Sequence, residues 1–233
     1  METLLPEPST VFQFDRTRQA APQVFEHMRH QIIALALPPG TVLSRPELAT
    51  RYGISQTPVR DALIRLAEEG LVDVFPQHAT RVSRIDVALA RQAHFLRRSV
   101  EIEIVRTLAA APDAALVERL RATIVRAARL LALQDLGEFS ENDQAFHRAL
   151  YEAAQVPDLY QLVHRQSGHL DRLRRLHLPI ADKAGAVLRD HTAIVEAIAA
   201  GDGARAEAVL RAHLSGTLAH LDEIRARHAD YLR

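Results

Sequence analysis

The sequence predicts a mainly α-helical protein made of two domains. Between residues 22 and 85, three helical patterns are followed by two short strands. After residue 86, apolar residues recur at the helical period of about 3.6 and strand patterns disappear. We therefore expect a flexible N-terminal arm over residues 1–18, a small domain over 19–85 and an all-helical bundle of about six or seven helices over 86–233.

The composition excludes several classes of site and location. The 233 residues include no cysteine, which rules out disulfides, thiolate metal ligands and a cysteine nucleophile. No apolar run approaches the roughly 18 residues that predict a membrane-spanning helix, and the N-terminus lacks the basic start and apolar core of a secretion signal. We therefore expect a cytoplasmic protein with no membrane partner. The net charge is zero, so charge alone gives no indication of a nucleic-acid partner.

Three helices are predicted in the small domain, and a helix-breaking residue follows each of them. Their expected ranges are 22–37, 46–52 and 57–69. Pro38-Pro39-Gly40 ends the first helix, Gly53 provides a tight turn after the second, and Gly70 fits the C-terminal cap of the third. The segments LVDVF and TRVSRI, separated by PQHA, then predict a β-hairpin.

The second and third helices have the spacing of a helix-turn-helix. Ser55 is placed to cap the third helix, and Pro58 fits its first turn. The polar side chains left exposed at the N-terminal end of this helix are Gln56, Thr57 and Arg60. Glutamine and arginine can contact base edges in the major groove of DNA, and threonine can bind a phosphate. An ordinary helical hairpin with a solvated arginine is the alternative, but the β-hairpin that follows would supply a wing and favours DNA binding.

The segment Ser55–Leu63, SQTPVRDAL, resembles the signature of the GntR family of bacterial regulators. The segments around it, Pro39-Gly40, Glu47–Ala49, Leu66-Ala67 and Glu69–Val72, also fit that signature. The resemblance implies a winged helix-turn-helix that binds double-stranded operator DNA as a homodimer. It implies DNA contacts from several side chains: Gln56 and Arg60 to bases or phosphates, Ser55 and Thr57 as backbone anchors, and His78 at the wing tip.

Two positions depart from the family pattern. Ala79 stands in the wing turn, where the family often has glycine, and Arg45-Pro46 stands just before the second helix, where an acidic residue is common. We include Arg45 among the expected DNA contacts because a guanidinium group suits phosphate and guanine.

The bundle helices are expected over 86–111, 113–134, 140–155, 158–177, 182–200 and 203–231. Three of them place metal-binding groups on otherwise apolar faces. Asp143 and His147 are four residues apart and share one helix face, while His191 and His213 lie in apolar stripes of two other helices. Such groups can converge inside a bundle, and three imidazoles with one carboxylate suit a divalent ion such as zinc, nickel or manganese. Two alternatives remain: Asp143 could form a capping box with Ser140, and each histidine could be a core residue bonded to a backbone carbonyl.

The pattern over residues 86 to about 228 resembles the FCD-type ligand-binding domain of the FadR branch of the same family. In many members of that branch, an aspartate and three histidines at such positions hold a divalent metal ion, which implies this role for Asp143, His147, His191 and His213. The branch usually has an asparagine near the end of the third helix of this domain, where this chain has Ala154-Gln155.

Arg97 has two interpretations. The branch often has an arginine here that faces the ligand cavity, which implies that Arg97 binds an effector. Alternatively, Arg97 and Glu101 form a surface ion pair at i,i+4 spacing, which is worth only a few tenths of a kcal/mol.

Taken together, these features predict a transcriptional regulator and not an enzyme. Its operator binding would be modulated by a small carboxylate or sugar acid bound at the metal site. A metal-dependent enzyme using the same site is the first alternative, but no distinct acid–base partner stands out. A metal-free regulator that senses an acyl chain is the second, and the intact set of one aspartate and three histidines argues against it.

Overall fold

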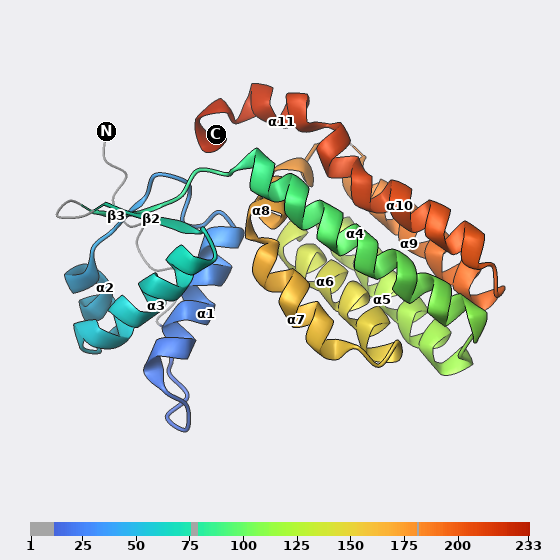
Figure 1. Cartoon of the computed structure of the whole chain (residues 1–233), viewed down its shortest axis with the longest axis horizontal. Coiled ribbons are helices and arrows are strands. Elements are labelled where there is room, and N and C mark those ends of the chain that lie inside the picture. The colour runs from blue at the N-terminus through green and yellow to red at the C-terminus, as the bar shows by residue number, and fades with distance from the viewer. Residues whose placement is uncertain (1–11, 76–78, 181) are drawn as a thin grey trace. The chain divides into compact units, whose positions relative to one another are not determined.

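A computed structural model describes residues 12–75, 79–180 and 182–233 (Figure 1). The chain divides into two compact units. The first comprises the chain up to Val87 together with Arg227–Arg233, and the second comprises Ala88–Ala226. The predicted fold class is confirmed, since helices dominate and the strands form one small sheet. Among the described residues, no helix is both long enough and apolar enough to cross a membrane.

The first unit contains three helices and a three-stranded sheet. Its elements are α1 (Ala20–Ile33), β1 (Val42–Leu43), α2 (Arg45–Tyr52), α3 (Gln56–Glu68), β2 (Val72–Val74) and β3 (Thr80–Val82). The sheet is antiparallel with the order β1-β3-β2, so β3 pairs with both neighbours. The sequence patterns did not predict β1, because a strand of two residues is too short to show alternation.

The core of the first unit lies between α1 and α3. Met28 and Ile32 of α1 are fully buried, as are Val59 and Leu66 of α3. These residues recur at helical spacing, so each helix turns one apolar stripe toward the other. Burial of these stripes fixes α3 and leaves its opposite face in solvent.

The expected flexible arm is already ordered from Phe12 onward. The rings of Phe12 and Phe14 lie 4.8 Å apart, and the Phe12 ring lies 5.5 Å from that of Tyr52 on α2. The Asp15 amide donates to the Gln23 side chain at 2.8 Å. The structure therefore differs from the expectation over residues 12–18, because two aromatic side chains there pack against the unit.

The last residues of the chain belong to the first unit, although they were expected in the bundle domain. Ile85 and Leu232 form a parallel β-bridge. The Ile85 amide donates to the Tyr231 carbonyl at 2.7 Å, and the Arg233 amide donates to the Ile85 carbonyl at 3.0 Å. Ile85 is fully buried and Leu232 nearly so. Burial of these two apolar side chains, together with the backbone hydrogen bonds, places the tail here.

The second unit is a helical bundle. Its helices are α4 (Val87–Ala110, beginning one residue inside the first unit), α5 (Ala114–Ala132), α6 (Leu136–Ala153), α7 (Pro157–Gln166), α8 (Gly168–His177), α9 (Lys183–Ala199), α10 (Gly203–Ala219) and α11 (Leu221–Arg227). A 3-10 turn over Ala229–Tyr231 follows. Helix α5 packs against α6 and α9, and α9 packs against α10. The core side chains Leu120, Leu150, Ile194 and Leu210 are fully buried.

Two expected bundle helices are each divided in two. The helix expected over 158–177 breaks at Ser167, whose hydroxyl donates to the His164 carbonyl at 2.9 Å, and Gly168 follows. The helix expected over 203–231 breaks at His220, whose ring contacts the Gly216 carbonyl at 2.8 Å. Both breaks depend on local side-chain hydrogen bonds, which compete with the helix but leave the apolar pattern unchanged.

Candidate functional site

The helix-turn-helix is formed by α2 and α3. The hydroxyl of Ser44 accepts a hydrogen bond from the Glu47 amide at the start of α2. Gly53 ends α2 in the left-handed conformation, with φ of 65°, as expected from its position. Ser55 occupies the capping position of α3, but its side chain makes no capping hydrogen bond. The predicted capping role of the Ser55 side chain is therefore wrong, although the helix begins where expected.

The expected DNA contacts lie on the solvent-exposed surface of this motif. The exposed members are Arg45, Ser55, Gln56, Thr57 and Arg60. Four of them lie at the N-terminal end of α3, and Arg45 is the first residue of α2. His78 lies outside the described residues. Because the opposite face of α3 is buried, this end is free to enter a major groove.

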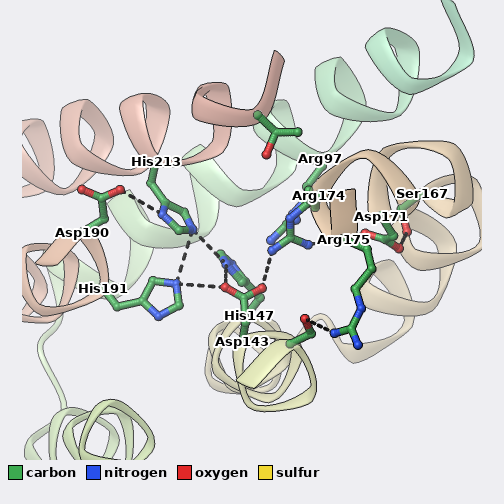
Figure 2. A network of polar contacts seen from close by, with 12 residues as sticks. Arg97, Asp143, His147, Ser167, Asp171, Arg174, Arg175, Asp190, His191 and His213 are labelled. Atoms are coloured by element: carbon green, nitrogen blue, oxygen red, sulfur yellow. Dashed lines mark hydrogen bonds and ion pairs between the residues drawn. The ribbon is translucent and has the colours of Figure 1, made fainter. Parts of the chain in front are cut away.

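A second cluster lies inside the bundle, where Asp143, His147, His191 and His213 converge (Figure 2). Each offers one ligand atom, and all four atoms lie within 4.8 Å of one another. The Nε2 atom of His213 is 3.3 Å from the Nε2 atoms of both His147 and His191. The Oδ1 atom of Asp143 is 3.5 Å from His191 Nε2 and 4.0 Å from His147 Nε2.

Three helices that are distant in sequence position these ligands. Asp143 and His147 come from α6, His191 from α9 and His213 from α10. Helix α6 begins at Leu136 and is capped by Asp135, whose side chain accepts from the Glu138 amide. Asp143 therefore lies two turns inside the helix, which excludes the capping-box alternative with Ser140.

In two of the three histidines, the ring nitrogen that faces away from the cluster contacts a carboxylate. The Nδ1 atom of His147 is 2.8 Å from Oε2 of Glu101, and the Nδ1 atom of His213 is 3.2 Å from Oδ2 of Asp190. For His147 and His213, the Nδ1 atoms therefore meet carboxylates and not the backbone carbonyls that we considered as the alternative for core histidines. A carboxylate at Nδ1 favours a proton there, which leaves the Nε2 lone pair directed into the cluster.

The cluster therefore brings together lone pairs of nitrogen and oxygen atoms, and one of these atoms has no hydrogen-bond donor among the described residues. Asp143 Oδ1 is buried and has no hydrogen-bond partner among the described residues. Bonds from zinc to imidazole nitrogen are about 2.0–2.1 Å long, which places neighbouring ligand atoms of a tetrahedral site about 3.3–3.4 Å apart. The distances of 3.3 Å from His213 Nε2 to the Nε2 atoms of His147 and His191 agree with that value. The residues present thus fit a divalent cation.

The charges around the cluster keep its ligands in the forms that bind metal. Burial raises the pKa of Asp143, but Arg174 and the histidines His147, His191 and His213 together outweigh burial and hold that pKa well below its ordinary value. The Nη2 atom of Arg174 contacts Asp143 Oδ2, which leaves Oδ1 facing the histidines. Burial also lowers the pKa of His191 well below its ordinary value, so this imidazole is neutral near pH 7.

Arg97 lies beside the cluster in a buried ion pair. Its Nε atom is 2.7 Å from Glu101 Oε1, and the two side chains are only 8% and 2% exposed. The surface-pair alternative is therefore wrong about location, because the i,i+4 pair forms inside the bundle. Arg97 and Glu101 also border a small cavity of about 30 Å³. The other residues that line the cavity are Gln144, His147, Tyr151, Tyr160, Val163, His164, Ser167, Asp171 and Arg174.

The sequence patterns missed three polar residues that serve the cluster. Glu101 was considered only as a partner of Arg97, and Asp190 and Arg174 were not considered. Asp190 directly precedes His191 but serves His213 on the next helix, so only the packing of α9 on α10 reveals its role. Arg174 lies in the basic segment RLRR, where charge alone does not distinguish it from its neighbours.

Two protein families match the chain. The family described as "Bacterial regulatory proteins, gntR family" matches residues 20–82, and the FCD domain family matches residues 92–216. An HTH-type transcriptional regulator from an unstable DNA locus of Streptomyces ambofaciens is 39% identical over 203 residues, which covers 87% of this chain and 85% of that protein. The HTH-type transcriptional repressor RspR of Escherichia coli K12 is 27% identical over 219 residues, covering 94% and 96%.

Solved structures share the fold. Escherichia coli McbR/YncC matches with a TM-score of 0.76 at 21% identity, over 88% of this chain and 98% of that one. A transcriptional regulator from Rhodococcus sp. RHA1 matches with a TM-score of 0.72 at 23% identity, over 86% and 96%. GntR-type regulators bind DNA and FCD domains bind small-molecule effectors, so the two matched families identify a regulator and not an enzyme. The chain belongs to the GntR family of bacterial transcriptional regulators, with an FCD effector-binding domain after its helix-turn-helix.

Proposed function

We propose that this regulator binds its operator as a homodimer and that a small carboxylate or sugar acid, bound at a divalent metal ion, changes its affinity for DNA. The metal would be held by Asp143, His147, His191 and His213. The observation that carries this proposal is the convergence of three Nε2 atoms and one carboxylate oxygen in a buried site. When bound, the ion supplies a positive centre that a carboxylate can coordinate.

The charges beside the cluster fit a small anion. Among the residues that line the cavity or form the cluster, the two arginines Arg97 and Arg174 and the three carboxylates of Glu101, Asp143 and Asp171 have a summed charge of −1. A divalent ion changes it to +1, which one carboxylate group neutralises. The cavity lies against Arg97, Arg174 and His147, so a carboxylate there would meet both guanidinium groups.

The same cavity argues against an acyl-chain effector. Its volume is about 30 Å³, and most of its lining residues are polar or charged. An apolar cavity of about 150 Å³ is needed to hold a molecule the size of benzene. A long acyl chain would require a much larger and less polar space, whereas a short acid requires only local movement of side chains.

A homodimer follows from the limited reach of one recognition helix. The polar end of α3 would cover only a short stretch of major groove, and a second copy would supply the contacts to the other half of a two-fold symmetric operator. We expect light scattering to give a dimer at micromolar concentration. A monomer both with and without operator DNA would contradict this part of the proposal.

The effector would act by binding one arrangement of the bundle more tightly than another. It can change operator affinity only by that difference, and DNA must change effector affinity by the same factor. A coupling of about 1–3 kcal/mol, which is typical, would change operator affinity about 5–150-fold.

The test compares His191→Ala with His30→Ala. His191 is a proposed ligand, whereas His30 is an exposed histidine at the end of α1. We expect His191→Ala to lose bound metal and all response to an acid that alters operator binding by the wild type, while His30→Ala keeps both. Metal content by atomic spectroscopy and operator affinity by titration, with and without the acid, are the measurements. Full metal occupancy and a full response in His191→Ala would overturn the proposed site.

A further inference from the structure

One residue that lines the cavity beside the metal cluster, Tyr160, has a buried hydroxyl with no hydrogen-bond partner among the described residues. Tyr160, on α7, is only 7% exposed, and its side chain lines the cavity. Its hydroxyl makes no hydrogen bond with any of the described residues. Buried polar groups in native proteins nearly always have a partner, so an exception on a residue that lines a cavity marks a place for a bound water or a ligand.

The ring of Tyr160 is held in place by its neighbours. It stacks on the His164 ring with centroids 5.5 Å apart, and it meets the Tyr151 ring edge-on at 5.5 Å. The guanidinium of Arg148 lies 4.9 Å from its centroid. These contacts involve the ring and not the hydroxyl. The ring of Tyr160 is therefore fixed at the edge of the cavity by contacts that leave its hydroxyl without a bond.

Three other residues that line the cavity, Tyr151, Arg97 and Glu101, already contact one another. The Tyr151 hydroxyl donates to Glu101 Oε1 at 3.3 Å, and Arg97 Nε donates to the same oxygen at 2.7 Å. The other carboxylate oxygen of Glu101 faces His147. Tyr151 and Tyr160 thus form a matched pair, in which one hydroxyl has a protein partner and the other has none.

We propose that the Tyr160 hydroxyl selects the effector by donating a hydrogen bond to a second oxygen of the acid. The effector class is then a short acid that carries another oxygen function, such as a hydroxy acid, an oxo acid or a dicarboxylate, and not an unsubstituted short-chain acid. This inference rests on the proposed function, because it takes the first carboxylate to be bound at the metal ion and Arg97. A site built to bond a substrate oxygen strongly rejects the analogue that lacks it, since its own polar group is then left unpaired.

The first experiment measures thermal stability without ligand. Tyr160→Phe removes a hydroxyl that lacks a protein partner, so we expect an unchanged or higher Tm. Tyr151→Phe removes a hydroxyl bonded to Glu101, so we expect a lower Tm. Tyr231→Phe, outside the bundle unit, is the control for the substitution itself. A fall in Tm for Tyr160→Phe as large as that for Tyr151→Phe would overturn the premise that the hydroxyl is unpaired.

The second experiment measures selectivity by calorimetric titration of the full chain loaded with metal. The probes are butanoate, 3-hydroxybutanoate and succinate. We expect the wild type and Tyr231→Phe to bind one of the oxygenated acids about three- to tenfold more tightly than butanoate. Tyr160→Phe should lose this preference while its affinity for butanoate stays unchanged, a pattern that a structural role for Tyr160 would not produce.

The outcomes separate this inference from the function on which it rests. If acids bind but Tyr160→Phe keeps the wild-type preference, the role of Tyr160 is overturned and the metal-bound acid stands. If the metal-loaded wild type binds none of the acids, both proposals are overturned. If binding and preference are the same with and without metal, the proposed function fails, because the acid is then held without the ion.

Discussion

The two candidate sites of this protein differ in how they are built. The expected DNA contacts among the described residues are exposed, and four of them lie close together in sequence, between Ser55 and Arg60. The four proposed metal ligands are buried and come from three helices, in the part of the chain from Asp143 to His213. A surface site of the first kind adds little to folding, whereas a buried charged site of the second kind must be satisfied for the bundle to be stable. Substitutions should therefore affect only DNA binding in the first site, but metal binding and stability together in the second.

The largest expected effect in the DNA-binding unit is that of Arg60→Ala. Loss of a bidentate contact to a base costs about 1–3 kcal/mol, which lowers specific affinity about 5–150-fold. If Arg60 contacts a phosphate, the slope of binding against salt should fall by about one unit instead. Because Arg60 is exposed, Tm should not change.

The control for this prediction is Arg129→Ala on α5. Arg129 is also exposed, so the substitution removes the same charge from the bundle unit. Titration of an operator fragment at several salt concentrations measures both variants. If Arg60→Ala retains wild-type affinity and salt dependence, the placement of α3 in the groove is wrong.

The next largest effect is the loss of metal affinity that we expect from Asp190→Asn in the bundle. Asp190 contacts Nδ1 of His213 at 3.2 Å, and its loss removes the carboxylate that orients this ligand. Such outer partners typically contribute a factor of about 10–100 to metal affinity. Its side chain is 34% exposed, so the variant should fold and show the effect as weaker metal binding.

Asp158→Asn on α7 is the matched control, because Asp158 is exposed and is not part of the cluster. Metal affinity can be measured by competition with a chelator of known strength. An unchanged affinity in Asp190→Asn would indicate that the contact between Asp190 and His213 does not serve the ion.

The same contrast explains which features the sequence could predict. The helix-turn-helix was predictable because its signals are local: Gly53 at the turn, a buried stripe on α3 and polar residues at its start. The grouping of Asp143, His147, His191 and His213 was predictable because each lies on an otherwise apolar helix face. The buried pair of Arg97 with Glu101 was predicted by spacing but not by location, since spacing within one helix does not report which face is covered.

The features that the sequence missed depend on contacts between distant segments or on side-chain hydrogen bonds. Asp190 serves a histidine on the neighbouring helix, and Arg174 reaches Asp143 from α8. The break at Ser167 follows from hydrogen bonds that the apolar pattern does not record. The tail was assigned to the bundle because its helical pattern continues past α10, yet Ile85 pairs with Leu232 in the first unit.

The smallest expected effect concerns this tail, and it tests whether the two sites are coupled through the chain. The segment between β3 and α4 is fixed on one side by Ser83, whose hydroxyl donates to the Gly70 carbonyl at 2.7 Å, and on the other by Ile85, which bonds the tail. Helix α10 carries His213 and continues through α11 into that tail. The chain therefore connects the units twice, near Val87 and near Arg227. We expect deletion of residues 231–233 to reduce the effector-induced change in operator affinity by at most about fivefold, because the connection near Val87 remains.

Arg233→Ala is the matched control, since it removes the contacts of Arg233 with Asp73 and Asp86 but keeps the backbone hydrogen bonds to Ile85. Arg233 is 46% exposed, and exposed ion pairs contribute about 0–1 kcal/mol, so this variant should retain nearly all of the effector response. Metal content should be the same in both variants, because neither touches the cluster. A truncated protein with an unchanged effector response would show that the coupling passes through the Val87 connection alone. A truncated protein that loses metal would show that the tail stabilises the bundle. The DNA-binding unit and the metal cluster would then not be independent of each other.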